Sequence, residues 1–120
     1  MESDKPSAEL AVIGGSGVYS LDSLEDSEKF VVETSYGESP EIVVGNVKDR
    51  RVAFMPRHGE SHDTPPHKIN YRANIQALKD IGAEGIFATT AVGSLNPEMK
   101  PGELVLLSQF LDFTKNRSLT

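Results

Sequence analysis

Two short apolar runs joined by one amphipathic segment constrain the fold more than any other feature of the sequence. The runs cover residues 51–55 and 85–92, and the segment between them has helical periodicity from Asn70, a good N-cap residue, to residue 81, with Gly82 just past its end. The apolar residues of this segment, which we expect to face a sheet, are Tyr71, Ile75, Leu78 and Ile81. A strand, a helix and a strand in this order require two parallel strands and a right-handed crossover.

Other runs predict the remaining strands. Residues 10–13 predict a buried first strand, and residues 30–34 and 42–47 predict two more, joined as a hairpin in which Gly37 supplies a positive φ angle. Residues 18–29 predict a loop or a weak helical turn. Residues 85–92 lack alternation, as expected of a strand covered on both faces. The predicted fold class is α/β, with a mixed, partly parallel central sheet and flanking helices.

The last part of the chain indicates an incomplete domain. Residues 103–113 form a long apolar run, which we expect to be a strand in the middle of a sheet, and only residues 114–120 follow it. An α/β sheet needs helices on both faces, whereas the sequence has one convincing helix. We therefore expect residues 1–120 to be the N-terminal part of a single larger domain, apparently truncated, with residues 1–8 as a disordered tail.

Composition and charge exclude several classes of protein. The absence of cysteine excludes a disulfide scaffold and cysteine-based catalysis. No apolar run approaches the roughly 20 residues that span a bilayer, so we expect no membrane partner. A net charge of −6 argues against nucleic-acid binding. Most acidic residues precede Val43, whereas cations gather between Lys48 and Arg72, which favours a small anionic ligand. For Lys48, Arg50 and Arg51 a solvated surface is the simpler interpretation.

A glycine-rich turn, Gly14-Gly15-Ser16-Gly17, directly follows the first predicted strand. Glycines let backbone N–H groups turn toward one point, and a serine hydroxyl adds a donor, which suits phosphate or a ribosyl oxygen. A turn that binds nothing is the alternative. The dinucleotide fingerprint is excluded because Ser20 occupies its third glycine position, and a P-loop is excluded because no Gly-Lys-Ser/Thr follows.

Two further strand ends carry groups that suit an oxyanion. Arg57 and His58 follow the run 51–55, and arginine can grip two phosphate oxygens while an imidazole donates a third bond. A surface ion pair is the alternative for Arg57. The residues Thr-Thr-Ala-Val-Gly-Ser (89–94) close the run 85–92, and a threonine hydroxyl with the next backbone N–H forms a paired donor set. Two threonines that only belong to the core at a strand end are the alternative. Together the three turns predict a phosphate site.

The histidines suggest a metal site only weakly. His58, His62 and His67 have spacings that suit a helix, but Gly59 and the Pro65-Pro66 pair place them on a loop. No second ligand cluster accompanies them, so we expect no metal. His62 is a candidate donor over the site, whereas His67 is expected to be structural.

The motifs together resemble those of methylthioadenosine phosphorylase, a branch of the trimeric purine nucleoside phosphorylases. They are Gly-Gly-Ser-Gly (14–17), Met-Pro-Arg-His-Gly (55–59), Pro-His-Lys-Ile-Asn-Tyr-Arg-Ala-Asn-Ile (66–75) and Thr-Thr-Ala-Val-Gly-Ser-Leu (89–95). Their order and spacing agree with the family from residue 10 to about residue 113. The resemblance implies that the phosphate-binding groups are Ser16, Arg57, His58, Thr90 and Ala91. It also places Gly15 and His62 near the substrate.

The resemblance implies phosphorolysis, in which 5′-methylthioadenosine and inorganic phosphate give adenine and 5-methylthioribose 1-phosphate. It further implies a homotrimer that uses phosphate as a co-substrate and needs no cofactor. The absence of cysteine fits a cytoplasmic location. In this family the acid that protonates the purine belongs to the C-terminal half of the sequence. No catalytic residue is therefore assigned in residues 1–120. Residues 1–120 alone are expected to be inactive.

Two other interpretations remain open at this point. One is a non-catalytic phosphate- or nucleotide-binding module of flavodoxin-like architecture, and the other is an inactive remnant without a ligand. Within the family, these motifs do not discriminate among methylthioadenosine, methylthioinosine and 6-oxopurine nucleosides.

Overall fold

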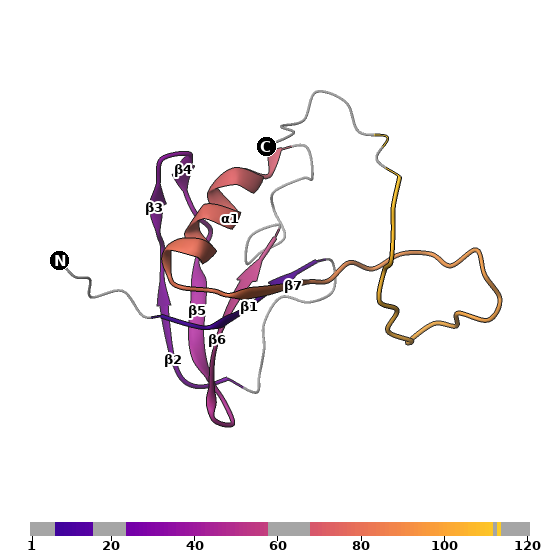
Figure 1. Cartoon of the computed structure of the whole chain (residues 1–120), viewed down its shortest axis with the longest axis horizontal. Helices are drawn as coiled ribbons and strands as arrows, with labels where there is room; N and C mark the ends of the chain where they lie inside the picture. Colours follow the sequence, from indigo (N-terminus) through magenta and orange to yellow (C-terminus); the bar gives the residue numbers. More distant parts are fainter. Residues whose placement is uncertain (1–6, 16–23, 58–67, 112, 114–120) are drawn as a thin grey trace.

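The computed structural model describes residues 7–15, 24–57, 68–111 and 113, which form a mixed sheet with one helix (Figure 1). The strands are β1 (Leu10–Gly14), β2 (Glu25–Phe30), β3 (Glu33–Thr34), β4 (Gly37–Glu38), β5 (Ile42–Val47), β6 (Arg50–Pro56) and β7 (Gly85–Ala88), and the helix is α1 (Tyr71–Asp80). Five strands form the main sheet in the order β2-β5-β6-β1-β7, and β3 and β4 form a separate two-stranded hairpin. The predicted mixed α/β fold is confirmed.

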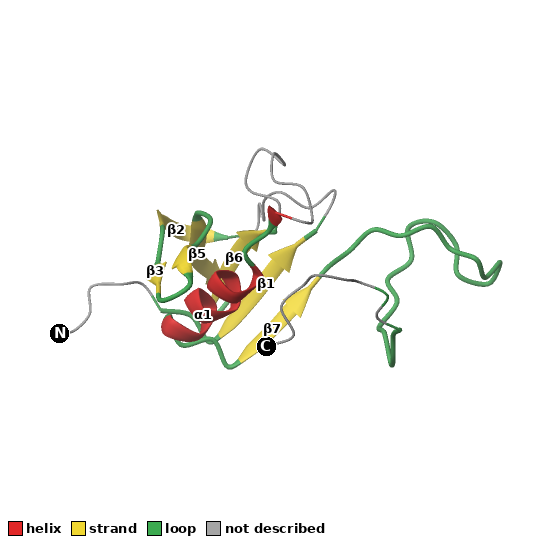
Figure 2. Cartoon of the chain, turned by 90° about the horizontal axis from the view of Figure 1, so that it is seen from above, coloured by secondary structure: helices red, strands yellow, loops and turns green. Residues whose placement is uncertain are grey.

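The predicted parallel crossover is present, with one strand inserted into it. The chain runs from β6 through α1 to β7, and both strands are parallel to β1, which lies between them. Val12 is the partner of Phe54 on one side and of Phe87 on the other. The other half of the sheet, β6-β5-β2, is antiparallel. Figure 2 shows α1 against one face of this sheet.

The predicted caps of α1 are both observed. Asn70 accepts a hydrogen bond from the backbone N–H of Ala73 at 3.1 Å, and Gly82 follows the helix with a φ angle of 96°. The Asn70 amide also donates to the carbonyl oxygen of Tyr36 at 2.7 Å, and the Arg72 guanidinium lies 5.6 Å from the centre of the Tyr36 ring. The start of α1 is therefore tied to the β3–β4 hairpin.

The predicted buried face of α1 is partly wrong. Leu78 and Ile81 are buried as expected, whereas Ile75 is 50% exposed and Tyr71 is half-buried. The residues that complete the buried face are Ala73, Asn74 and Ala77. The buried stripe of α1 is therefore formed by these three residues with Leu78 and Ile81, and Ile75 lies outside it. Helical spacing predicted the helix, and packing decided which stripe of it is buried.

One core joins α1 to the sheet. Its buried members are Ala8, Ala11, Ile13, Val32, Ile42, Val44, Ala53, Met55, Ala77, Leu78 and Ile81. Ala8 also donates its backbone N–H to the carbonyl oxygen of Ile81. The predicted disordered tail, 1–8, is therefore wrong at Ala8, because burial and this hydrogen bond order that residue. Residues 1–6 lie outside the described residues.

The antiparallel edge differs from the prediction. The second half of the segment 18–29 belongs to β2, which pairs with β5 through a bulge between Glu25 and Glu28. The predicted strand 30–34 is split, because Phe30 ends β2 opposite Ile42 while Glu33 and Thr34 belong to the small hairpin. A charged strand without an apolar face is typical of a sheet edge, where only backbone pairing is required. The positive φ of Gly37 occurs as expected, but in the β3–β4 hairpin.

A pair of carboxyl groups lies across that hairpin. Glu33 is directly opposite Glu38, and the pKa of Glu33 is raised by a hydrogen bond to Glu38 and by that group's negative charge. A proton shared between them relieves the repulsion. The contribution of this pair to folding is therefore present at low pH and is lost as pH rises through the raised pKa.

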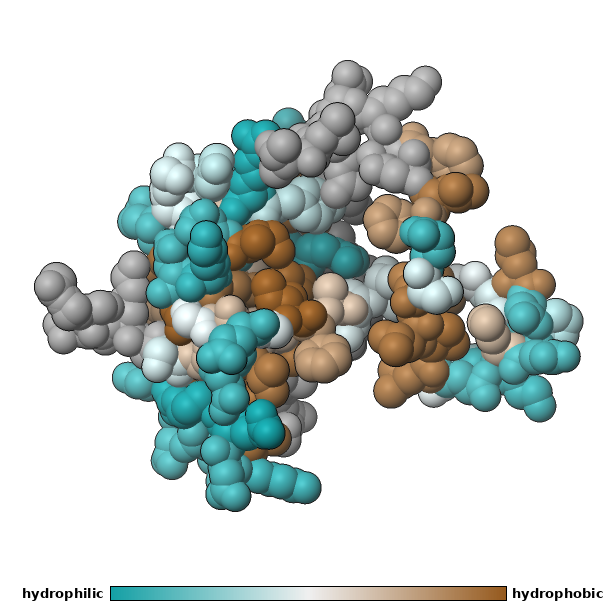
Figure 3. Space-filling view, viewed as in Figure 1, coloured by the Kyte–Doolittle hydropathy of each residue, from teal (hydrophilic) through white to brown (hydrophobic). Residues whose placement is uncertain are grey.

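The strands at the end of the chain differ from the prediction within the described residues. β7 ends at Ala88, and Phe87 is 63% exposed, so this strand is not covered on both faces. Residues 103–111 form no strand, and Leu104, Leu106 and Leu111 are exposed. Figures 1 and 3 show the chain after β7 leading away from the sheet with apolar side chains on its surface. An apolar run forms a strand only against a neighbour that satisfies its backbone, and no described segment supplies one.

No helix in the described part of the chain combines the length and apolar character needed to cross a membrane.

Replacing Leu78 by alanine is expected to lower the free energy of unfolding by about 2–5 kcal/mol, because it opens a cavity in the core. Ile75→Ala, on the same helix but half-exposed, is the control and is expected to cost about 1 kcal/mol or less. Urea denaturation of the protein at its natural length measures both. Equal losses for the two variants would contradict the observed orientation of α1.

Candidate phosphate site

Three parallel strands have their carboxyl ends on the same side of the sheet, and the residues that directly follow these strands lie together at one junction. The strands are β1, β6 and β7, and the residues that follow are Gly15, Arg57 and Thr89. The backbone N–H of Arg57 donates to Gly14 at 2.8 Å, and that of Thr89 donates to Ile13 at 2.9 Å. Since parallel strands end on the same side of a sheet, these turns adjoin as the sequence predicted.

A hydrogen bond between Gly15 and Thr89 joins the turns that follow β1 and β7. The Gly15 backbone N–H donates to the Thr89 hydroxyl oxygen at 2.9 Å. Gly15 is buried, and a Cβ atom at this position would collide with the carbonyl oxygen of Thr89 and lie 2.9 Å from Nη2 of Arg57. The close approach of the two backbones therefore requires glycine at position 15.

Arg57 provides the positive charge at this junction. Its side chain is half-buried, and Nη1 donates to the carbonyl oxygen of Thr89 at 3.4 Å. The guanidinium therefore lies over the contact between Gly15 and Thr89. A planar group with five N–H donors suits the oxygens of phosphate or carboxylate. The predicted convergence of the glycine turn, the arginine and the threonine turn is thus observed for the described residues.

The remaining predicted site residues divide into two groups. Thr90 and Ala91 directly follow Thr89 and are exposed at the same edge of the sheet. Ser16, His58 and His62 lie outside the described residues, although Ser16 and His58 are the sequence neighbours of Gly15 and Arg57. The structure therefore describes the framework of the predicted site, and the contacts of these five residues with phosphate or substrate stay predictions.

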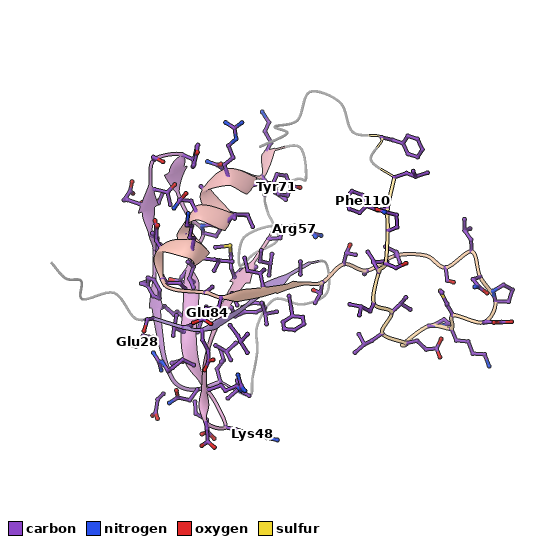
Figure 4. The ribbon with its side chains drawn as sticks, viewed as in Figure 1. Glu28, Lys48, Arg57, Tyr71, Glu84 and Phe110 are labelled. Carbon is purple, nitrogen blue, oxygen red and sulfur yellow. The ribbon has the colours of Figure 1, made fainter. Side chains whose placement is uncertain are left out.

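The cations of the middle segment do not form one cluster. Arg50 and Arg57 are at the two ends of β6, and Figure 4 shows Lys48 and Arg57 at opposite ends of the sheet. Arg50 contacts Glu9 at 3.4 Å, and Arg51 donates to Asn46. The expectation that these two arginines belong to a solvated surface agrees with their partly exposed positions. Arg57 is separated from them by the length of the strand.

The structure describes only some of the side chains that could bind a metal ion. The described ranges contain no group of three or more histidine, cysteine, aspartate or glutamate side chains that could hold a metal ion. His58, His62 and His67 are outside those ranges, so the expectation that they bind no metal stays a prediction.

Thr89 is the residue whose importance the sequence understated. The motif contains both threonines and the family resemblance singles out Thr90, whereas the hydroxyl of Thr89 makes the contact with Gly15. A usable signal existed, because Thr89 is the first residue after a strand parallel to β1, at the same level as Gly15 and Arg57. Equivalent positions after neighbouring parallel strands come together whatever their side chains are.

Comparison with known proteins identifies the family. The model of the phosphorylase superfamily matches residues 9–120. The chain is 56% identical over 111 residues to the 6-oxopurine nucleoside phosphorylase of Pyrococcus furiosus, covering 92% of this chain and 41% of that protein. It is 52% identical over 119 residues to the S-methyl-5′-thioadenosine phosphorylase of Hyperthermus butylicus, covering 97% and 43%. The chain belongs to the phosphorylase superfamily.

Solved structures agree with this assignment. The apo methylthioadenosine phosphorylase of Schistosoma mansoni superimposes with a TM-score of 0.87 at 41% identity, covering 95% of this chain and 41% of that one. The resemblance to the methylthioadenosine and purine nucleoside phosphorylases is thereby confirmed, as is the expected fold. The chain spans about two fifths of the length of the curated relatives that it matches.

The collision at Gly15 generates a stability prediction. Gly15→Ala is expected to lower the free energy of unfolding by about 1–3 kcal/mol, because the new methyl group must displace the backbone of Thr89. Gly93→Ala is a matched control, since no heavy atom lies within 4 Å of the Cβ position there, and a change below about 1 kcal/mol is expected. Denaturant unfolding compares the two, and a Gly15→Ala protein as stable as Gly93→Ala would show that the junction is not tightly packed.

Proposed function

We propose that the protein is a purine nucleoside phosphorylase and that this portion of it holds the phosphate. The observation that carries the proposal is the convergence of Gly15, Arg57 and Thr89 at the end of three parallel strands. The names of its relatives support the same chemistry, because they include both a 6-oxopurine nucleoside phosphorylase and methylthioadenosine phosphorylases. Inorganic phosphate and a purine nucleoside are the proposed partners.

The proposed reaction is a substitution at the anomeric carbon of the ribose. A phosphate oxygen forms a bond to C1′ while the bond from C1′ to the purine nitrogen breaks, and the purine leaves with the electron pair. The transition state resembles a ribosyl cation, so an anionic phosphate held below it both attacks and stabilises the developing charge. The base must gain a proton as it leaves, and no residue described in this portion is assigned to deliver it. Neither a metal nor a cofactor is required by these steps.

Each proposed phosphate group has a separate task. Arg57 supplies a fixed positive charge and a fork of donors. Ser16, His58 and Thr90 supply side-chain donors, and the backbone N–H of Ala91 supplies one more. None of them needs to transfer a proton, because they orient the nucleophile. Gly15 and His62 are proposed to lie near the substrate.

We propose 5′-methylthioadenosine as the substrate, with adenine and 5-methylthioribose 1-phosphate as products. The motifs that resemble methylthioadenosine phosphorylase support it, as do relatives with that name. A 6-oxopurine nucleoside is the second candidate, favoured by the Pyrococcus furiosus relative. Methylthioinosine, which has the 5′-methylthio group of the first candidate and the 6-oxopurine base of the second, is a third candidate. A homotrimer in the cytoplasm is the proposed assembly and location.

Phosphate-dependent release of the base tests the activity. The protein at its natural length, incubated with methylthioadenosine and inorganic phosphate, is expected to release adenine, and inosine and methylthioinosine are tested in parallel. Omitting phosphate is the control and should abolish release. Binding of phosphate without cleavage of any purine nucleoside would instead indicate the non-catalytic module. The same assay on residues 1–120 expressed alone is expected to show no turnover.

Arg57→Ala tests the phosphate site itself. Loss of a charged hydrogen-bond donor costs about 1.5–3 kcal/mol, so the KM for phosphate is expected to rise about 10- to 150-fold. Arg50→Ala is the matched control, because it removes the same side chain from the other end of β6, where an exposed pair with Glu9 is worth little. Initial rates at varied phosphate distinguish them. An unchanged phosphate KM in Arg57→Ala would contradict the proposed role of this residue.

A further inference from the structure

Thr89, the first residue after β7, contacts the turns that follow both of the other parallel strands, β1 and β6. Its backbone N–H donates to Ile13 at 2.9 Å, its hydroxyl oxygen accepts from the N–H of Gly15 at 2.9 Å, and its carbonyl oxygen accepts from Nη1 of Arg57 at 3.4 Å. Thr89 thus hydrogen-bonds to Ile13 in β1 and to the arginine side chain. It therefore couples the position of Gly15 to the position of the guanidinium.

We propose that Thr89 is a positioning residue for phosphate, and that its hydroxyl sets phosphate affinity by holding the glycine turn and Arg57 in one arrangement. The inference rests on the proposed function, because it concerns the same site. It assigns Thr89 an indirect role, exerted through Gly15 and Arg57. The residues assigned to contact phosphate are unchanged.

The hydroxyl matters because Gly15 is buried. A buried N–H group without an acceptor is costly, so loss of the Thr89 oxygen favours a shift of the Gly15 backbone toward another partner. Such a shift has little room within the present packing, because even one added Cβ atom on Gly15 would collide with the carbonyl oxygen of Thr89 and lie 2.9 Å from Nη2 of Arg57. The two turns must then separate.

Separation of the turns moves several proposed phosphate groups together. Ser16 follows Gly15 and Thr90 follows Thr89 in the chain, while Arg57 is held by the Thr89 carbonyl oxygen. Donors that surround one anion must be placed to within a fraction of an ångström, and misplacement by about 1 Å can cost 100-fold in rate. A change at Thr89 is therefore expected to act on phosphate more than on the nucleoside.

Thr89→Val removes the hydroxyl and keeps the β-branched shape, whereas Thr89→Ser keeps the hydroxyl. In Thr89→Val the KM for phosphate is expected to rise about tenfold, with the KM for the nucleoside within about twofold of wild type. Thr89→Ser is expected to restore the phosphate KM to within about threefold of wild type. Initial rates of the protein at its natural length, measured with each substrate varied in turn, give both constants.

Thr34→Val is the matched control for general loss of stability. Thr34 is also half-buried at a strand end, and its hydroxyl likewise accepts a backbone N–H, that of Tyr36 at 3.1 Å. It belongs to the β3–β4 hairpin and makes no hydrogen bond to the junction in the described residues. The phosphate KM of Thr34→Val is expected to equal that of wild type.

The outcomes separate this inference from the proposed function. A wild-type protein that cleaves no purine nucleoside refutes the function, whereas an active wild type with an unchanged phosphate KM in Thr89→Val refutes only the role of Thr89. Equal increases in both KM values, equal effects of Thr34→Val, or failure of serine to restore affinity would also overturn it. If Thr89→Val cannot be purified, Thr89→Cys retains a weak acceptor, and its phosphate KM is expected to rise about threefold; no rise would overturn the inference.

Discussion

The parallel pairing of β1 with β6 on one side and β7 on the other is the constraint on which the candidate site depends. It brings together Gly15, Arg57 and Thr89, which are far apart in the chain. Each of them is the first residue after a parallel strand, and the three strands end on the same side of the sheet. α1 makes the arrangement possible, since a helix returns the chain from the end of β6 to the start of β7. The core beneath α1 thus maintains the order of the strands, and the order of the strands places the site.

At the junction, backbone groups provide the geometry and one side chain provides the charge. Gly15 contributes a buried N–H and the absence of a Cβ, and Thr89 contributes acceptors to both neighbouring turns. Arg57 contributes a positive charge, and its guanidinium donates a hydrogen bond to the carbonyl oxygen of Thr89. Rigid backbone donors and a constrained guanidinium cost little reorganisation when an anion binds.

The two edges of the sheet have different surfaces. β2 is exposed and carries mostly charged residues, which disfavours the addition of another strand. β7 exposes Ile86 and Phe87, and the apolar residues of the following segment are also exposed, as Figure 3 shows. The sheet is therefore bordered by charged side chains at β2, whereas exposed apolar side chains continue from β7 into the segment that follows it.

Local patterns in the chain were sufficient to predict most of the strands, α1 with its caps, the parallel crossover and the three turns of the site, because periodicity, capping and strand-end chemistry depend on near neighbours. Tertiary packing decided the rest. It buried Ala73 and Ala77 in place of Ile75, made a strand of the charged segment at β2, and left residues 103–111 without a strand partner. It also selected Thr89, whose hydroxyl acquires its role only when β7 lies beside β1 and brings it to Gly15.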